Sequence, residues 1–359
     1  MERFVSDRLY LDHAATTPMT AGARAAVLAG MAMWANPSSP HGEGRAARKA
    51  LEEARAQVAA AYGWTSEVLF TSGASESLGI ALNRVHAPAR YASAVEHDAV
   101  WRSGADPRVL PVDEQGVVTR EGLDAISGGL VCVQWCNSET GVRQPIAGIA
   151  EAVHAAGALL LVDAAQMPAG EGAEVAAHAD LVALSAHKRG GPPGVGALLV
   201  RDLAVLAPSG GQERGYRAGT ENLPGVLGYA AALEEAEPVE RWVRLRARLD
   251  DAVRRSGGEV VGEGAARHPA IGSYRMPGVA ATAQLIRMDL DGIAVSAGSA
   301  CASGSLKPSH VLRAMGWDEA ATREVLRVSF GRTTTQDEVD RFIAAWRAIA
   351  RERRGAFAA

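Results

Sequence analysis

The sequence contains only three lysines, Lys49, Lys188 and Lys307, because arginine supplies almost all of its basic charge. Lys188 follows the apolar run Leu181–Ser185 and precedes a turn rich in Gly and Pro. An amine at the carboxyl end of a buried strand lies where an α/β sheet binds its ligands. Lys49 lies in a charged segment typical of a solvated helix face, and Lys307 precedes Pro308, which favours an extended loop. Lys188 is therefore the candidate for amine chemistry, with a structural ion pair as the alternative.

Asp163 is a second candidate, since it closes the apolar run Leu159–Asp163. A carboxylate at the end of a buried strand is costly unless a cationic partner lies beside it. The pyridinium nitrogen of pyridoxal phosphate (PLP) is such a partner, and a carboxylate that keeps this nitrogen protonated makes the ring an electron sink. Taken alone, Asp163 could equally bind a metal or cap a helix. The lysine at position 188, one strand–helix unit later, favours the cofactor.

A phosphate group needs donors, and the segment after the apolar run Val68–Thr71 offers them. A helical stretch is opened by the segment Ser72–Ser77, whose residues are small apart from Glu76. Backbone N–H groups at a helix start and the helix dipole together favour an anion, and the Ser75 hydroxyl can add a donor. A plain helix cap is the alternative. Ser185 and His187, which flank the lysine, could supply further donors.

His97 follows the apparent strand Tyr91–Val95. A histidine at that strand end could stack on a pyridine ring and exchange protons with a ligand. A histidine with a purely structural role is the alternative.

The elements that position these residues follow from hydrophobic patterning. Six short apolar runs lack polar alternation, as expected for strands buried on both faces; they are Val68–Thr71, Tyr91–Val95, Leu130–Trp135, Leu159–Asp163, Leu181–Ser185 and Ala197–Val200. Between them, segments such as Ile146–Ala156 carry apolar residues at helical spacing. This alternation predicts a three-layer α/β domain with a largely parallel sheet, whose ligands collect at the carboxyl ends of the strands.

Further helices are expected at Arg45–Ala61, at Glu234–Arg255 and in a C-terminal segment opened by Thr335. The length of 359 residues suits one large and one small domain. We expect residues 12–240 to form the large domain. Residues 1–11 and 241–359 then form a small domain that carries Cys301.

Composition restricts the classes of protein. The net charge of −4 gives no basic face for nucleic acid, and no segment resembles a signal peptide or a spanning helix, so we expect a cytoplasmic protein with no membrane partner. Three cysteines are an odd number and do not suggest a disulfide framework. The C-x3-C pair Cys132 and Cys136 lacks the usual zinc partners, so we predict no metal site and place both on one face of a buried strand.

At this point the chain resembles a known family through an ordered set of motifs. They are Tyr10–Pro18, Asn36–Ser39, Thr71–Ser77, Asp163–Gln166, Ser185–Lys188, Arg217–Thr220 and Ser299–Ser303. The set is similar to that of class V aminotransferase-type enzymes and, within them, to the cysteine desulfurases of the NifS/IscS-like group. The resemblance spans nearly the whole chain.

The resemblance implies a fold-type-I PLP enzyme, with a large α/β/α domain around a mainly parallel seven-stranded sheet and a small α+β domain. It implies a homodimer with each active site at the subunit interface. Lys188 would anchor the cofactor covalently, Asp163 would meet the ring nitrogen, and His97 would stack on the ring. The remaining implied contacts are Ala74, Ser75, Ser185 and His187 on the phosphate with Thr220 from the partner, Gln166 on the phenolic oxygen, and Asn36 and Arg332 on the substrate carboxylate.

One stretch departs from the family pattern, which often has two asparagines before Glu-x-Gly. Here the sequence reads Asn137-Ser138-Glu139-Thr140-Gly141. Ser138 occupies the position that would contact the phenolic oxygen, and Asn137 is the weaker candidate.

Cys301 separates a desulfurase from a general transaminase. It lies in a run of small residues that offers little apolar packing, so a reactive thiolate is favoured over a structural cysteine. By resemblance, the Lys188 amine removes the Cα proton of L-cysteine. Cys301 then attacks the substrate sulfur, holds it as a persulfide and passes it to an acceptor protein, while alanine is released.

Three alternatives stay open at this point. A selenocysteine lyase would use the same cofactor chemistry on selenium. A class V PLP transaminase would leave Cys301 without a role. A non-catalytic docking protein is disfavoured, because Lys188, Asp163, His97 and Cys301 are all present.

Overall fold

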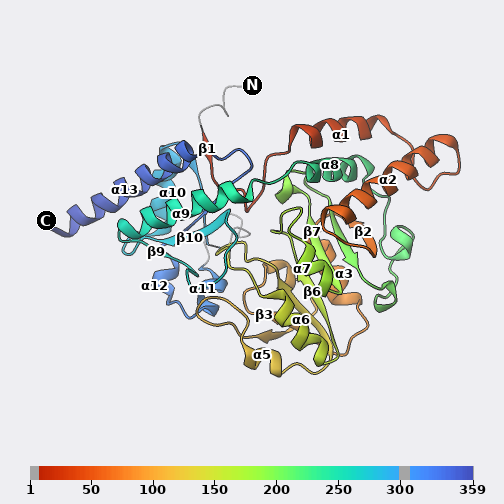
Figure 1. Cartoon of the computed structure of the whole chain (residues 1–359), viewed down its shortest axis with the longest axis horizontal. Helices are drawn as coiled ribbons and strands as arrows, with labels where there is room; N and C mark the ends of the chain where they lie inside the picture. The colour runs from red at the N-terminus through yellow and green to blue at the C-terminus, as the bar shows by residue number, and fades with distance from the viewer. Residues whose placement is uncertain (1–7, 299–307, 359) are drawn as a thin grey trace.

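A computed structural model describes residues 8–298 and 308–358. Its larger part is built on a seven-stranded sheet with strand order β2-β8-β7-β6-β5-β3-β4 (Figure 1). The strands are β2 Glu67–Thr71, β3 Arg90–Ser93, β4 Arg108–Leu110, β5 Gly129–Gln134, β6 Ala158–Asp163, β7 Leu181–Ser185 and β8 Gly196–Val200. Only β8 runs antiparallel to both of its neighbours; the other pairings are parallel. The predicted fold class is therefore confirmed.

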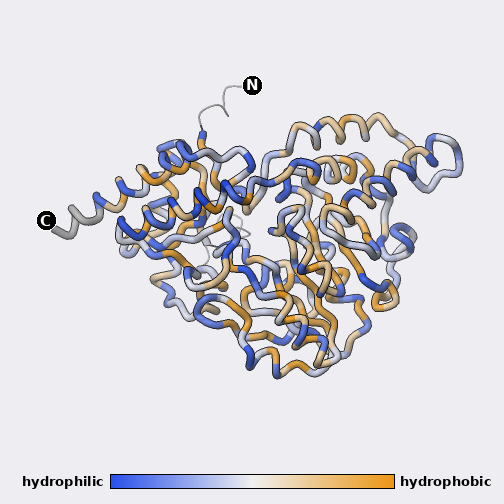
Figure 2. Tube along the Cα trace, in the orientation of Figure 1, coloured by the Kyte–Doolittle hydropathy of each residue, from blue (hydrophilic) through white to orange (hydrophobic). Residues whose placement is uncertain are grey.

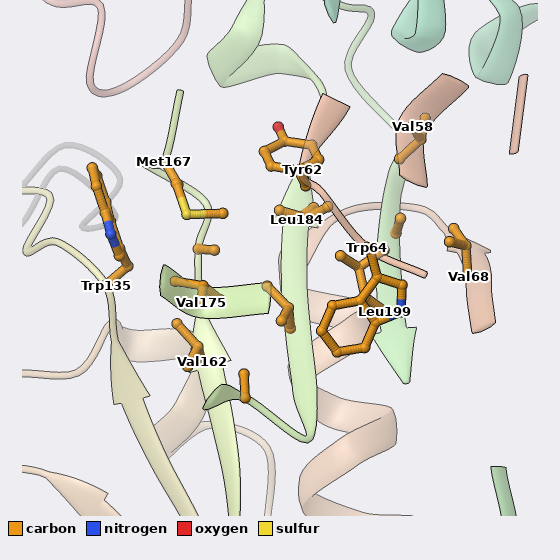
Figure 3. Close-up of a cluster of buried hydrophobic side chains, with 14 of the residues drawn as sticks. Val58, Tyr62, Trp64, Val68, Trp135, Val162, Met167, Val175, Leu184 and Leu199 are labelled. Carbon is orange, nitrogen blue, oxygen red and sulfur yellow. The ribbon is translucent and has the colours of Figure 1, made fainter. Parts of the chain in front are cut away.

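Helices cover both faces of this sheet, which explains the unbroken apolar runs of its strands. Every residue of β5, β7 and β8 is buried. One face packs against α2 (Gly42–Ala61), α6 (Ile146–Ala155), α7 (Ala173–His178) and α8 (Leu223–Glu234), and Figure 3 shows part of this core. The other face packs against α3 (Ala74–Arg84) and α4 (Asp98–Trp101). In Figure 2 apolar residues gather on these central strands.

The smaller part contains a four-stranded antiparallel sheet of order β12-β13-β10-β9 and a parallel pair, β1 with β11. These strands are β1 Leu9–Tyr10, β9 Glu259–Val260, β10 Ile271–Arg275, β11 Ile293–Ala294, β12 Ser296–Ala297 and β13 Val325–Ser329. Its helices are α9 Val239–Arg255, α10 Ala281–Leu290, α11 His310–Ala314, α12 Glu319–Thr322 and α13 Gln336–Ala358. A separate apolar core holds this part together.

The remaining elements are short or peripheral. They are α1 Ala21–Ala32, α5 Arg120–Asp124 and the 3-10 turns η1 His187–Arg189, η2 Leu203–Val205 and η3 Glu213–Gly215. The predicted start of α13 is confirmed, because the Thr335 hydroxyl accepts from the Glu338 amide and Glu338 reaches back to the Thr335 amide. Among residues 8–298 and 308–358, no helix is long and apolar enough to cross a membrane.

Three expectations need correction. The predicted helix Glu234–Arg255 begins later, at Val239 (α9), because Glu234 is the last residue of α8 and Pro238, which has no N–H, separates the two helices. Strand β3 ends at Ser93, short of the predicted Val95. Cys132 lies on β5, but Cys136 lies beyond the end of that strand in the following turn, so the two do not share a strand face.

Candidate active site

A cavity of about 390 Å³ opens where β2, β5, β6 and β7 end. The structure brings together at this cavity the predicted residues Ala74, Ser75, His97, Ser138, Asp163, Gln166, Ser185, His187 and Lys188. The residues come from separate strand ends and turns. The parallel sheet collects them because the carboxyl ends of its strands share one edge.

Lys188 lies in the single 3-10 turn that follows β7. Two backbone hydrogen bonds tie this turn to the N-terminal segment: Thr17 N–H donates to His187 C=O, and Thr20 N–H donates to Gly190 C=O, both at 2.9 Å. Gly190 adopts a left-handed φ of +80°, and a Cβ there would lie 2.6 Å from Thr20 Cγ2. Glycine at this position therefore lets the turn close and fixes the backbone that carries the lysine.

Asp163 ends β6 and is only 7% exposed. One carboxylate oxygen, Oδ1, accepts a hydrogen bond from the Ala165 amide at 3.0 Å. The side chain therefore has a fixed orientation at the wall of the cavity. A cationic ring nitrogen placed there would meet a carboxylate that is largely out of water.

His97 caps α4, and its Nδ1 accepts from the Ala99 amide at 3.1 Å. This bond assigns the proton of the neutral ring to Nε2. Burial, and then the charge of Lys188, lower the pKa of His97, so the ring is neutral at pH 7. Behind it, Glu96 is fully buried and accepts from Ser93 Oγ at 2.6 Å and the Gln134 amide at 2.8 Å. Burial raises the pKa of Glu96 to about 8.

The start of α3 forms an anion cradle at the cavity wall. Gly73 caps the helix with φ +152°, and the amides of the first turn have no partner within the helix by geometry. Gly196 on the neighbouring strand packs against Gly73, where a Cβ would lie 2.6 Å from the Gly73 Cα. The His187 ring also lines this part of the cavity; its Nδ1 is engaged by Thr16 Oγ1 at 3.1 Å, and burial lowers the pKa of this histidine to about 4. These donors suit a phosphate group.

Gln166 is buried beside the cavity. Its Nε2 donates to the Ala14 carbonyl at 2.9 Å, while Oε1 is buried and has no hydrogen-bond partner within the described part of the chain. An anion cradle, a lysine amine, a carboxylate and a partly satisfied amide thus surround one cavity. This set of donors and acceptors fits PLP, which carries a phosphate, an aldehyde, a ring nitrogen and a phenolic oxygen.

Several predicted residues do not line this cavity. Asn137 is buried, but its Nδ2 donates to Val95 C=O and its Oδ1 accepts from the amides of Glu139 and Thr140, so the side chain closes a turn. The adjacent Ser138 lines the cavity instead.

Three further predicted residues lie elsewhere. Asn36 and Thr220 are exposed. Arg332 lines a small hollow that shares Ala14, Gln166 and Lys188 with the main cavity. Cys301 lies outside the described residues.

Three charged residues that the sequence analysis did not assign to the site also line the cavity: Arg327, Glu139 and Glu76. Arg327 donates to Asp12 Oδ1 at 2.6 Å and to the Ser138 carbonyl at 3.0 Å. Glu139 accepts from Ser309 Oγ at 2.6 Å. The sequence feature that could have identified Arg327 is its place inside the apolar strand Val325–Ser329, since a buried charge requires a partner.

Comparison with known proteins agrees with this geometry. The model of the family "Aminotransferase class-V" matches residues 9–342. A cysteine desulfurase of Cereibacter sphaeroides is 38% identical over 368 residues, covering 94% of this chain and 94% of the relative. The solved structure of a NifS-like protein is 30% identical, with a TM-score of 0.86, over 95% of this chain and 99% of that one. A structure titled "SspA in complex with cysteine" is 27% identical, with a TM-score of 0.78, over 91% and 100%.

Family model, relatives and cavity geometry thus agree over nearly the whole length of the sequence. The chain belongs to the class V aminotransferase family, whose members use PLP.

Proposed function

We propose that this protein is a PLP-dependent cysteine desulfurase, which converts L-cysteine to L-alanine and transfers the sulfur to an acceptor protein. One observation carries the proposal: Lys188, Asp163, His97 and the start of α3 meet at one cavity in a chain 38% identical to a cysteine desulfurase. A similar structure holds cysteine itself, which supports this substrate.

The residues present would hold PLP in one orientation. The amides of Ala74 and Ser75 at the start of α3, with Ser185 and His187, would bind its phosphate. Asp163 would pair with the ring nitrogen and the neutral His97 ring would pack on the pyridine face. Lys188 would hold PLP when no substrate is present, and PLP would supply an electron sink for the bonds to the Cα of an amino acid joined to it.

The chain itself then moves protons. The Lys188 Nζ amine would take the proton from the substrate Cα and return one to the product. The neutral His97 can donate from Nε2, since Nδ1 is occupied by the Ala99 amide. Asn36 and Arg332 would hold the substrate carboxylate.

The proposed assembly is a homodimer, with Thr220 supplied by the partner to the phosphate. In one chain Thr220 is exposed and away from the cavity. Helix α1 and the residues after it expose Leu28, Met31 and Trp34, which are 65%, 66% and 78% exposed. An apolar surface of this kind beside Asn36 supports burial against a second copy.

Cys301 is the proposed sulfur carrier. It follows Ser296 by five residues, and Ser296 on β12 pairs with Arg327, which lines the cavity. The described chain therefore approaches the cavity within five residues of this cysteine. Its sulfur would attack the substrate Sγ; the S–S bond forms, the C–S bond breaks, and the bonding electrons pass to the substrate carbon, which is protonated and leaves as alanine.

The test is turnover of L-cysteine with a thiol reductant, which should give alanine and sulfide in equal amounts. Cys301→Ser should bind PLP normally and lose sulfide formation. Full activity of this variant with cysteine would refute the persulfide step. If the Cys301→Ser variant lost activity with cysteine but kept it with selenocysteine, a selenocysteine lyase would be favoured. A transaminase would instead convert amino and keto acids without releasing sulfide.

A further inference from the structure

Glu237 lies in the short linker between α8 and α9, next to the residue that breaks the two helices apart. Its side chain is 3% exposed, although the linker itself lies near the surface. The carboxylate joins two arginines: Oε2 accepts from Arg189 Nη1 at 2.9 Å and Oε1 accepts from Arg332 Nη2 at 3.1 Å. Arg189 follows the cofactor lysine directly in the sequence. The linker therefore places a buried carboxylate beside the active site.

Arg332 is held on one side by three acceptors. Its Nε donates to Glu235 C=O at 3.2 Å, and Nη2 donates to Ala232 C=O at 3.4 Å as well as to Glu237. Nη1 forms no hydrogen bond within the described residues. This nitrogen lies against the lysine turn, because a Cβ on Gly190 would be 3.0 Å from it. The guanidinium thus presents its Nη1 edge towards the side on which Lys188 lies.

The charges of the cluster favour one further anion. Arg189 and Arg332 carry two positive charges in a largely buried place and share the one buried carboxylate of Glu237, while the exposed carboxylate of Glu235 also acts on Arg332. Two arginines that share one buried carboxylate leave Arg332 able to take the carboxylate of an amino acid on its remaining edge.

We propose that Glu237 is a positioning residue, which orients Arg332 so that its Nη1 edge receives the substrate carboxylate. The proposal rests on the proposed function only in assigning an amino-acid carboxylate to Arg332. Glu237 itself touches neither substrate nor cofactor and acts through the guanidinium that it holds.

The experiment uses the PLP-loaded enzyme and two measurements. L-alanine, which has the substrate's amine and carboxylate but no sulfur, is titrated while the absorption of the bound cofactor is followed. KM and kcat are then measured with L-cysteine. Glu237→Ala should weaken L-alanine binding about tenfold or more and raise KM similarly, because a charge-assisted contact depends on the held geometry, while kcat stays within about threefold.

A double-mutant cycle separates positioning from general damage. Arg332→Ala should weaken binding at least as much as Glu237→Ala, and adding Glu237→Ala to it should cause less than about a twofold further loss. The proposal would be overturned if Glu237→Ala weakened L-alanine binding equally in the wild type and in Arg332→Ala, or in neither. Glu234→Ala removes a nearby exposed charge whose contact is with Gln57, and it should leave binding unchanged.

Removing Glu237 leaves two buried arginines without their shared partner, so Glu237→Gln is the second variant. Its amide oxygen can still accept from Arg332, and it should show a smaller loss of binding than Glu237→Ala. A loss equal to that of the alanine variant would contradict the role of this hydrogen bond. Should the enzyme release no alanine from cysteine, the proposed function fails, yet the L-alanine titration still tests Glu237.

Discussion

Replacing Asp163 with Asn tests the proposed pairing with the cofactor nitrogen. Asp163 is 7% exposed and its Oδ1 accepts from the Ala165 amide at 3.0 Å. Asparagine has nearly the same shape and can keep this hydrogen bond, so the turn after β6 should be retained. The substitution removes only the negative charge from the cavity.

The magnitude follows from the effect of a nearby charge. An opposite charge within about 4–6 Å shifts a pKa by about 1–3 units, and one unit corresponds to about 1.4 kcal/mol. Without Asp163 the ring nitrogen of bound PLP would lose about 1.4–4 kcal/mol of preference for its protonated form. The rate of alanine formation should therefore fall by about 10- to 1000-fold, because an unprotonated ring is a weaker electron sink.

The assay is alanine release from L-cysteine, with PLP occupancy measured by absorbance. Asp180→Asn is the matched control, since Asp180 carries a carboxylate at the other end of the sheet, where Oδ2 accepts from the Leu160 amide at 2.8 Å. It should reduce stability without a comparable loss of rate per bound cofactor. If Asp163→Asn kept its rate within about threefold at full occupancy, the assignment of Asp163 to the ring nitrogen would be wrong.

Three further predictions concern stability, each measured by chemical denaturation. Gly196→Ala should lower the free energy of unfolding by about 1–3 kcal/mol, because its Cβ would lie 2.4 Å from Leu184 C=O; an unchanged midpoint would contradict the close packing at the phosphate cradle. Burial raises the pKa of Glu96 to about 8, so the folded state keeps a proton that the unfolded chain loses above its ordinary value of 4.5. The contribution of Glu96 to stability should therefore fall as pH rises from 4.5 to 8, and Glu96→Gln should make the slope of stability against pH more positive over this range than in the wild type; an identical pH slope would refute it. Burial lowers the pKa of His13 to about 4, so only the unfolded chain takes up this proton as pH falls from 6.5 to 4. His13→Gln should therefore recover up to roughly 3 kcal/mol of the stability that the wild type loses at pH 4, and an unchanged loss would contradict this role of His13.

Much of the large sheet could be predicted from the sequence. Strands such as Leu181–Ser185 are apolar without alternation because helices cover both faces, and this property is local to each run. Strand β4 could not be found in this way, since Arg108 and Val109 are exposed and form no apolar run. The helix break before Val239 was missed because charged residues continue on both sides of Pro238, which hides the boundary from composition.

The candidate site likewise contains residues that the sequence places and residues that it does not. Asp163 and Lys188 could be placed at the cavity from sequence, because a residue at the end of a buried parallel strand reaches the ligand edge whatever its neighbours are. Whether Asn137 or Ser138 faces the cavity depends on Val95, which lies on another segment and takes the Asn137 amide.

The tertiary structure was also needed to place three charged residues, Arg327, Glu139 and Glu237. Their partners, Asp12, Ser309 and Arg332, lie 315, 170 and 95 residues away in the chain. The sequence by itself determined the cofactor chemistry, through strand ends and motif order. The tertiary structure alone decided which buried charges surround that chemistry, because ion pairs between distant segments form only when the two parts of the chain pack together.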